Sequence, residues 1–243
     1  MNNIKIVYQY DGGNYFGMQK QFRNRTIESE IVKIIEIITK EKINLITAGR
    51  TDRGVHALCQ VSNFHTHLNI DAKKWKYILN RGLPKDIRVV DVAIVDKKFH
   101  SRFDAKKREY EYHISWDESP FKSRYNLIVK QEIDSEKLKQ ILKVVEGVHN
   151  FKNFKIAEDV KKNTTREIYE VDVLQVSEKE IKIKISAPSF LRSQVRIIVG
   201  TALDIYFERA DKNTMIEMLN NFDRDYKKTL AEPQGLFLSK IEY

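Results

Sequence analysis

Residues 43–65 read INLITAGRTDRGVHALCQVSNFH, and they decide how the first half of the chain folds. Residues 43–47 and 57–65 are rich in apolar and β-branched residues, which is typical of strands. The residues between these two runs include two glycines and three charged side chains, a composition typical of a loop. The pattern therefore predicts two strands joined by a loop that carries Asp52.

Asp52 lies between Arg50 and Arg53, and Gly49 and Gly54 flank the group. A nearby positive charge favours the ionised form of a carboxyl group, and an ionised carboxylate can act as a covalent nucleophile. Glycine permits close approaches that a side chain would block. In an extended segment Arg50 and Asp52 point to the same face, so they can pair. The alternative is a surface loop with an ordinary ion pair, which contributes little stability.

Periodic patterns on both sides of this stretch predict the remaining elements. The first half is expected to contain strand 4–10, helix 27–38, strands 43–47 and 57–65, helix 71–81 and strand 87–95. The second half repeats this order with strand 125–129, a helix within 134–147, strands near 169–173 and 181–185, helix 190–207, a short helix at 212–220 and strand 236–241.

These two halves predict an α+β fold made of two ferredoxin- or RRM-like βαββαβ units, with mixed antiparallel sheets and an active-site cleft between them. We expect an N-terminal α+β domain, residues 1–104, that carries the Asp52 loop. The C-terminal α+β domain, residues 105–243, is expected to complete the cleft.

Composition limits the classes of function. The chain has 243 residues and a net charge of +9 at pH 7, which favours a polyanionic partner, nucleic acid first and an acidic membrane surface second. No apolar run approaches the roughly 20 residues that a membrane helix needs, and the first residues lack the pattern of a signal peptide. Cys59 is the only cysteine, which excludes a disulfide within the chain and fits a reducing cytoplasm.

Two further segments hold candidate site residues. Residues 108–114 alternate so that Tyr110 and Tyr112 share one face of a strand, although tyrosines in this pattern usually pack. Arg192 and Arg196 are four residues apart in the expected helix 190–207, so they face one side. The alternative there is an amphipathic core helix with two solvated arginines. Basic clusters occur at 73–76, 97–98, 106–108, 161–162 and 227–228.

Residues 49–57, GRTDRGVHA, resemble the active-site signature of the TruA family of tRNA pseudouridine synthases. The resemblance extends in order and spacing over nearly the whole chain, through residues 10–21, 99–105, 108–112, 146–151, 190–200 and 231–238. The chain departs from the family's usual residues at Met18, Asn150, 192–194 and Ile197.

The resemblance implies the catalytic residues. Asp52 is the nucleophile, which attacks either the sugar or the base of a uridine. Arg50 takes part in extruding the target base, which is needed because the reacting atoms lie inside a stacked helix. Tyr110 contacts the uracil and takes part in proton transfer. An ion pair that only shapes the loop remains the alternative role of Arg50.

The resemblance also implies substrate-binding residues. Arg196 reaches the cleft as a partner of Asp52, and the terminal segment walls the uracil pocket. Independently of the resemblance, Arg102 and the basic residues 106–108 lie close in sequence to Tyr110, so we expect some of them to hold RNA phosphates, which positions the RNA without reading its sequence. Beyond Tyr110, the expected substrate-binding residues are Arg196, Leu236, Leu238, Arg102 and Arg108.

No cofactor or metal is expected. The chain lacks a P-loop and a dinucleotide-binding fingerprint. His56, Cys59, His65 and His67 lie close in sequence, but they lack the spacing of a zinc site. We expect structural roles for them.

The resulting expectation is a cytoplasmic, homodimeric enzyme that converts uridine to pseudouridine in RNA. The substrate implied by the resemblance is tRNA, at positions 38–40 of the anticodon stem-loop. One alternative is a related enzyme that modifies other uridines, such as those in ribosomal RNA. Another is a non-catalytic RNA-binding protein on the same scaffold, which would not require an ionised carboxylate facing an anionic partner.

Overall fold

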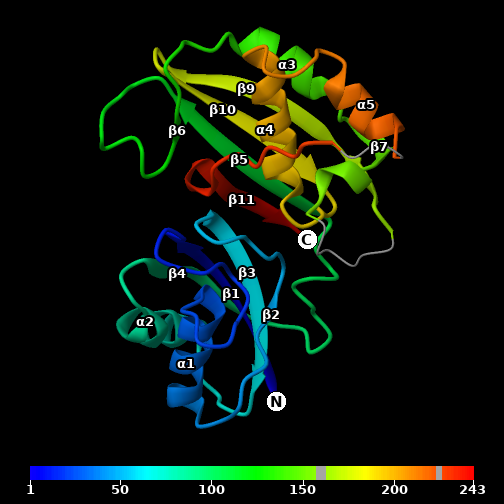
Figure 1. Cartoon of the computed structure of the whole chain (residues 1–243). Coiled ribbons are helices and arrows are strands. Elements are labelled where there is room, and N and C mark those ends of the chain that lie inside the picture. The colour runs from blue at the N-terminus through cyan, green and yellow to red at the C-terminus, as the bar shows by residue number, and fades with distance from the viewer. Residues whose placement is uncertain (157–162, 223–225) are drawn as a thin grey trace. The chain divides into compact units, whose positions relative to one another are not determined.

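The computed structural model describes residues 1–156, 163–222 and 226–243, so the basic cluster expected at Lys161 and Lys162 lies outside the described residues. The chain divides into two compact units (Figure 1). The first unit contains residues 1–106 and 237–243, and the second contains residues 107–236. The predicted α+β class is confirmed, since each unit combines helices with a largely antiparallel sheet. Across the described ranges, no helix has the length and apolar character needed to cross a membrane.

The first unit contains the predicted βαββαβ order. Its elements are β1 (Asn2–Tyr10), α1 (Ile27–Thr39), β2 (Ile46–Thr47), β3 (His56–Thr66), α2 (Ala72–Gly82) and β4 (Ile87–Val95), followed at the end of the chain by β11 (Leu236–Glu242). The strands lie in the order β4-β1-β3-β11, and β2 pairs with β3. All these pairs are antiparallel except β3 with β11, which is parallel and places Phe237 opposite His56.

Local sequence explains where both helices of this unit begin. Thr26 and Ser29 form a capping box at the start of α1. Asp71 caps α2 by accepting a hydrogen bond from the backbone of the third residue after it. Trp75 of α2 is fully buried and meets Phe64 of β3 edge-on, with ring centroids 5.5 Å apart. The apolar face of α2 therefore packs on the sheet that carries the Asp52 loop.

The second unit differs from the first in the number and order of its strands. Its elements are β5 (Lys107–Ser115), β6 (Leu127–Ile128), α3 (Ser135–Lys143), β7 (Gly147–Asn150), η1 (Lys152–Phe154), β8 (Thr165–Ile168), β9 (Glu170–Ser177), β10 (Glu180–Ala187), α4 (Gln194–Tyr206), α5 (Thr214–Asn220) and η2 (Pro233–Gly235). Strand β10 pairs antiparallel with β5 and β9, and β7 pairs with β8 in a separate sheet. Helix α3 packs against β9 and α4 (Figure 1).

Two elements of the second half differ from expectation. The expected strand 125–129 is only the two-residue β6, and β5 is the long strand with which this unit opens. The last strand is expected in the C-terminal domain, whereas residues 237–243 group with the first unit, and Phe237 and Leu238 of β11 pair with β3. The second half is therefore not a simple repeat of the first.

Helix α4 begins at Gln194, four residues later than the helix predicted from residue 190. Ser193 has a φ of 60°, a left-handed conformation that cannot continue a right-handed helix. The side chain of Gln194 accepts a hydrogen bond from the backbone N–H of Leu191 at 2.7 Å. Arg192 thus precedes the helix, and the prediction that Arg192 and Arg196 share one helical face is wrong.

Strands β5 and β10 carry a charged cluster around Glu111. The Glu111 carboxylate lies 2.9 Å from Nζ of Lys182 and 3.3 Å from Nε2 of His113. The hydrogen bond from His113, with that from Lys182, lowers the pKa of Glu111 from 4.5 to about 2, although burial acts in the opposite direction.

We predict that Glu111→Gln lowers the free energy of unfolding at pH 7 by about 1–2 kcal/mol, because it removes a charge-assisted hydrogen bond. The pKa of Glu111 is lower in the folded protein than in the unfolded chain. Its ionised form therefore stabilises the fold above about pH 5, and this contribution is lost as the pH falls towards 2. Denaturant unfolding of both proteins between pH 7 and pH 3 measures the effect.

Glu109→Gln is the matched control, since Glu109 is on the same strand and its carboxylate lies 4.0 Å from Nζ of Lys184. It should change the stability less. Coincident unfolding curves for the wild type and Glu111→Gln over the whole pH range would contradict the prediction.

Candidate active site

The Asp52 loop connects β2 to β3, and side chains of β1 and β3 hydrogen-bond to its residues before Asp52. Nε2 of Gln60 donates to the carbonyl oxygen of Gly49 at 2.9 Å. The hydroxyls of Tyr10 and Thr51 are 2.8 Å apart and hydrogen-bonded. Burial raises the pKa of Tyr10 to about 12, so its hydroxyl stays protonated at neutral pH. Buried groups of β1 and β3 thus fix the residues on the N-terminal side of Asp52, while Asp52 itself is only half-buried.

Asp52 begins a tight turn. The backbone N–H of Val55 donates to the carbonyl oxygen of Asp52 at 3.2 Å. Gly54, the third residue of the turn, has a φ of 79°, which side chains disfavour at that position. Val55 is buried. The turn therefore anchors the chain after Asp52 in the core and leaves Asp52 at its first position.

A second loop, residues 11–26, packs directly on this turn. The backbone N–H of Met18 donates to the carbonyl oxygen of Thr51 at 3.1 Å. Gly17 has a φ of 93°, and a Cβ there would lie 2.9 Å from the same oxygen and 3.2 Å from the backbone N of Arg53. The two backbones approach this closely only because residue 17 has no side chain. The position of Asp52 therefore depends on residues 17–18 as well as on its own loop.

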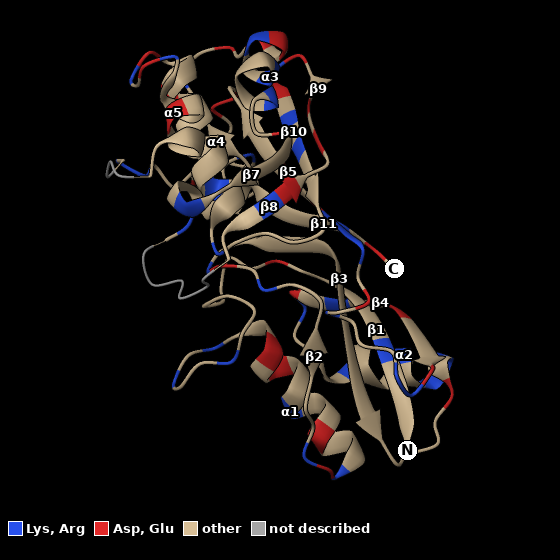
Figure 2. Ribbon diagram, turned by 90° about the vertical axis from the view of Figure 1, so that its right-hand side faces the viewer, with Lys and Arg blue, Asp and Glu red and all other residues tan. Residues whose placement is uncertain are grey.

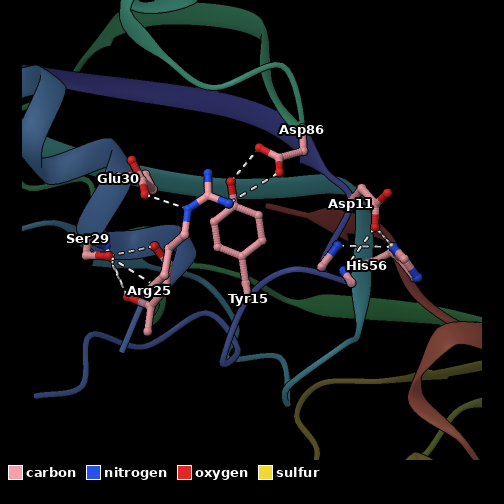
Figure 3. Close-up of polar contacts among 10 residues, drawn as sticks. Asp11, Tyr15, Arg25, Ser29, Glu30, His56 and Asp86 are labelled. Carbon is pink, nitrogen blue, oxygen red and sulfur yellow. Dashed lines mark hydrogen bonds and ion pairs between the residues drawn. The ribbon is translucent and has the colours of Figure 1, made fainter. Parts of the chain in front are cut away.

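His56 contacts three segments of the first unit, and Figure 3 shows its contact with Asp11. Its Nδ1 accepts a hydrogen bond from the backbone N–H of Gly12 at 3.1 Å and lies 3.1 Å from Oδ1 of Asp11. Its ring stacks on Phe237 of β11, with centroids 4.7 Å apart. The structural role expected for His56 thus consists of joining the end of β1, the start of β3 and β11. Sequence reasoning missed this connection, and the one signal for it is the position of His56 four residues after Asp52.

The other expected residue of this loop, Arg50, is exposed. Across the described ranges, Arg50 forms no ion pair, so the expected pairing with Asp52 is not present in this structure. Arg102 is also exposed, and its guanidinium lies 5.7 Å from the ring centroid of Phe103. Both arginines belong to the first unit.

Tyr110 and Arg196 belong to the second unit. Tyr110 lies on β5 opposite Ile185 of β10, and its ring meets Phe190 edge-on at 5.3 Å. Arg196 lies on α4, and its Nε donates to the carbonyl oxygen of Ala231 at 2.8 Å. The backbone N–H of Ala231 donates in return to the carbonyl oxygen of Arg196 at 3.0 Å. Arg196 therefore holds the terminal segment against α4.

The remaining expected substrate-binding residues are buried. Leu236 and Leu238 are 5% and 0% exposed, and they alternate along β11 with Phe237. Arg108 is 8% exposed, and its Nη1 donates to the carbonyl oxygen of Pro188 at 2.5 Å. Arg108 is therefore buried, whereas Arg102 is exposed to solvent.

Most departures from the family's usual residues have a packing role. Met18 is 1% exposed, and its sulfur accepts a hydrogen bond from the buried hydroxyl of Tyr8 at 3.8 Å. Gln194 and Ile197 are buried in and around α4. Oδ1 of Asn150 accepts hydrogen bonds from Thr164 and from the backbone of η1. Arg192, in contrast, is exposed. In the part of the chain that the structure describes, no three His, Cys, Asp or Glu side chains are grouped so as to hold a metal ion.

The sequence was compared with protein families and with known proteins, and it matches one family over most of its length. The sequence model of a family described as tRNA pseudouridine synthase matches residues 6–104 and 141–243. A tRNA pseudouridine synthase A of Thermoanaerobacter sp. (strain X514) is 38% identical over 245 residues, which cover 100% of both chains. One of Exiguobacterium sp. (strain ATCC BAA-1283 / AT1b) is 35% identical, covering 100% of this chain and 98% of the relative.

A solved structure of a Cbf5–Nop10–Gar1 complex is more distantly similar. The TM-score is 0.34 and the identity is 14%, covering 79% of this chain and 43% of that chain. This chain thus spans less than half of the chain that it matches there.

Proposed function

We propose that this chain, which belongs to the tRNA pseudouridine synthase family, converts uridine to pseudouridine in tRNA with Asp52 as the nucleophile. Isomerase activity follows from family membership and from relatives that match over their full length. The observation that supports the role of Asp52 is the attachment of its loop, since β1, β3 and the loop 11–26 each hydrogen-bond to Gly49 or Thr51, just before Asp52. A carboxylate that only formed a surface ion pair would not need such a support.

The reaction suits one fixed carboxylate. The bond between the sugar and N1 of uracil breaks, the uracil turns, and a bond from the same sugar carbon to C5 forms. The proton on C5 leaves, and N1 gains one, so the change is an isomerisation. Ordinary glycoside hydrolysis needs a second carboxylate to activate water, whereas here the carboxylate of Asp52 attacks the sugar or the base and is released when the carbon–carbon bond forms.

Tyr110 is proposed as the aromatic contact of the extruded uracil and as the group that moves the proton. A ring stacked on an extruded base is a common device of RNA recognition, and its hydroxyl can transfer a proton within hydrogen-bond reach. Arg50 is proposed to help extrude the base, which its exposure supports. Arg196, Leu236 and Leu238 are proposed to complete the uracil pocket, with Arg102 and Arg108 on the phosphates.

The proposed substrate uridines are those at positions 38–40 of the anticodon stem-loop. Relatives that match over their full length are named tRNA pseudouridine synthase A, which supports a tRNA substrate over ribosomal RNA. We further propose that the protein acts as a homodimer in the cytoplasm. Light scattering of the purified protein measures its oligomeric state, and the mass of a monomer would contradict the proposed homodimer.

We predict that Asp52→Asn lowers the single-turnover rate of pseudouridine formation by more than about a thousand-fold, the scale of removing a catalytic nucleophile. The amide keeps the shape of the side chain but cannot form the covalent intermediate. RNA affinity and melting temperature should stay close to the wild type. Asp91→Asn, an exposed position on β4, is the control and should keep the wild-type rate. Turnover near the wild-type rate by pure Asp52→Asn protein would contradict the proposed role of Asp52 as the nucleophile.

Tyr110→Phe tests the proton-transfer role. It keeps the ring, so RNA affinity should change little, but we expect a loss of roughly 100-fold or more in the single-turnover rate. If Tyr110 only packs against Phe190, the phenylalanine variant keeps its rate, and Tyr110→Ala mainly lowers the melting temperature through a cavity. Rates and melting temperatures of both variants decide between the two roles.

A further inference from the structure

The loop that packs on the Asp52 turn presents an aromatic ring at its tip. Gln21 and Asn24 form an isolated β-bridge, so residues 21–24 make a tight reversal. Phe22 at this reversal is 85% exposed. Arg23 has a φ of 63°, which is uncommon for a residue other than Gly, Asn or Asp, and its guanidinium lies 5.0 Å from the centroid of the Phe22 ring.

The stem below this tip is fastened on both sides. The backbone N–H of Phe16 donates to the carbonyl oxygen of Arg25 at 2.9 Å, and Nε2 of Gln21 donates to the carbonyl oxygen of Phe16 at 2.8 Å. The backbone N–H of Lys20 donates to the carboxylate of Glu28 at 2.8 Å. These bonds hold the tip away from the core, so the exposure of Phe22 is imposed by the loop.

Figure 3 shows a second fastening at the base of the loop. The hydroxyl of Tyr15 donates to Asp86 at 2.5 Å, and the guanidinium of Arg25 lies 4.4 Å above the Tyr15 ring. Nε of Arg25 also pairs with Glu30 of α1 at 2.8 Å. Burial and the neighbouring carboxylate of Asp86 raise the pKa of Tyr15, which keeps the donating hydroxyl protonated. The loop is therefore joined to α1 and to the segment that precedes β4.

The same loop is fixed relative to Asp52. Met18 and Gly17 contact the backbone of residues 51–53, as described above. In addition, the guanidinium of Arg53 lies 4.4 Å from the centroid of the half-exposed Phe16 ring. A molecule bound at Phe22 is therefore held at a set position with respect to the candidate nucleophile.

The charge of this loop favours an anionic partner. Lys20 and Arg23 lie at or beside the tip, whereas Arg25 is paired with Glu30 and the adjoining helix α1 carries glutamates (Figure 2). A single phenyl ring offers far less area than the roughly 1,200 Å² that a stable protein interface buries. One nucleobase, in contrast, covers one aromatic ring, and its phosphate matches a neighbouring guanidinium.

We propose that Phe22 and Arg23 form an RNA contact separate from the uracil pocket, in which Phe22 stacks on an unpaired base of the substrate and Arg23 binds an adjacent phosphate. This inference rests on the proposed function and adds a site that selects RNA with an unpaired nucleotide at a fixed distance from the target uridine. Stacking on Phe22 does not read base identity, because every base has a π-face.

The test compares Phe22→Ala with Tyr77→Ala. Tyr77 on α2 is 60% exposed, and Arg81 lies 5.7 Å from its ring, so it is an exposed aromatic–arginine pair of the same unit outside the loop. Dissociation constants are measured with an anticodon stem-loop RNA and with a fully paired RNA duplex. Phe22→Ala should weaken stem-loop binding roughly 5- to 100-fold and leave duplex binding unchanged. Tyr77→Ala should match the wild type on both RNAs.

Arg23→Asn tests the phosphate contact, because asparagine tolerates the left-handed conformation. It should weaken binding and reduce the slope of log affinity against log salt by about 1. Wild-type stem-loop affinity of Phe22→Ala overturns the proposal, and so does an equal loss on stem-loop and duplex. The turnover of the wild type is measured separately: a wild-type protein that binds RNA but forms no pseudouridine overturns the proposed function and leaves the binding comparison to decide on Phe22.

Discussion

The close packing of residues 17–18 on residues 51–53 is the contact on which the candidate site depends. Two loop backbones meet there without a side chain between them, and one hydrogen bond joins Met18 to Thr51. Asp52 follows Thr51 directly, so any shift of this contact moves the carboxylate. Misplacing a reacting group by about 1 Å can cost two orders of magnitude in rate. The backbone geometry of these two loops therefore sets the position of the carboxylate.

Other features of the first unit reinforce the same contact. The Tyr10–Thr51 hydrogen bond holds the turn from the side of β1, and His56 ties β1 and β3 to Phe237 of β11. The last strand of the chain therefore supports the Asp52 loop where that loop joins β3. Residues 237–243 of this strand group with the first unit, although the chain reaches them only after the whole second unit.

The sequence predicted the first unit well because each of its elements has a clear local signal. The capping residue Thr26, the helical spacing of apolar residues in α1 and the glycine-flanked Asp52 turn are all readable within a few residues. Long-range features were not readable. Nothing local indicates that residues 237–243 pair with β3, or that Ser193 adopts a left-handed conformation and delays α4. The contact between Gly17 and Thr51 joins residues 34 positions apart, and the glycine at position 17 is its one sign in the sequence.

The comparison of Gly17→Ala with Gly13→Ala tests this account most directly. A Cβ at Gly13 would meet only the side chain of Asp11, at 3.1 Å, whereas a Cβ at Gly17 would meet the backbone of the Asp52 turn. We expect Gly17→Ala to fold, to bind RNA with nearly wild-type affinity, and to lose roughly 10- to 100-fold in single-turnover rate. The amides of residues 49–55 should exchange faster, while Gly13→Ala resembles the wild type. A folded Gly17→Ala protein with the wild-type rate would contradict the claim that this contact positions Asp52.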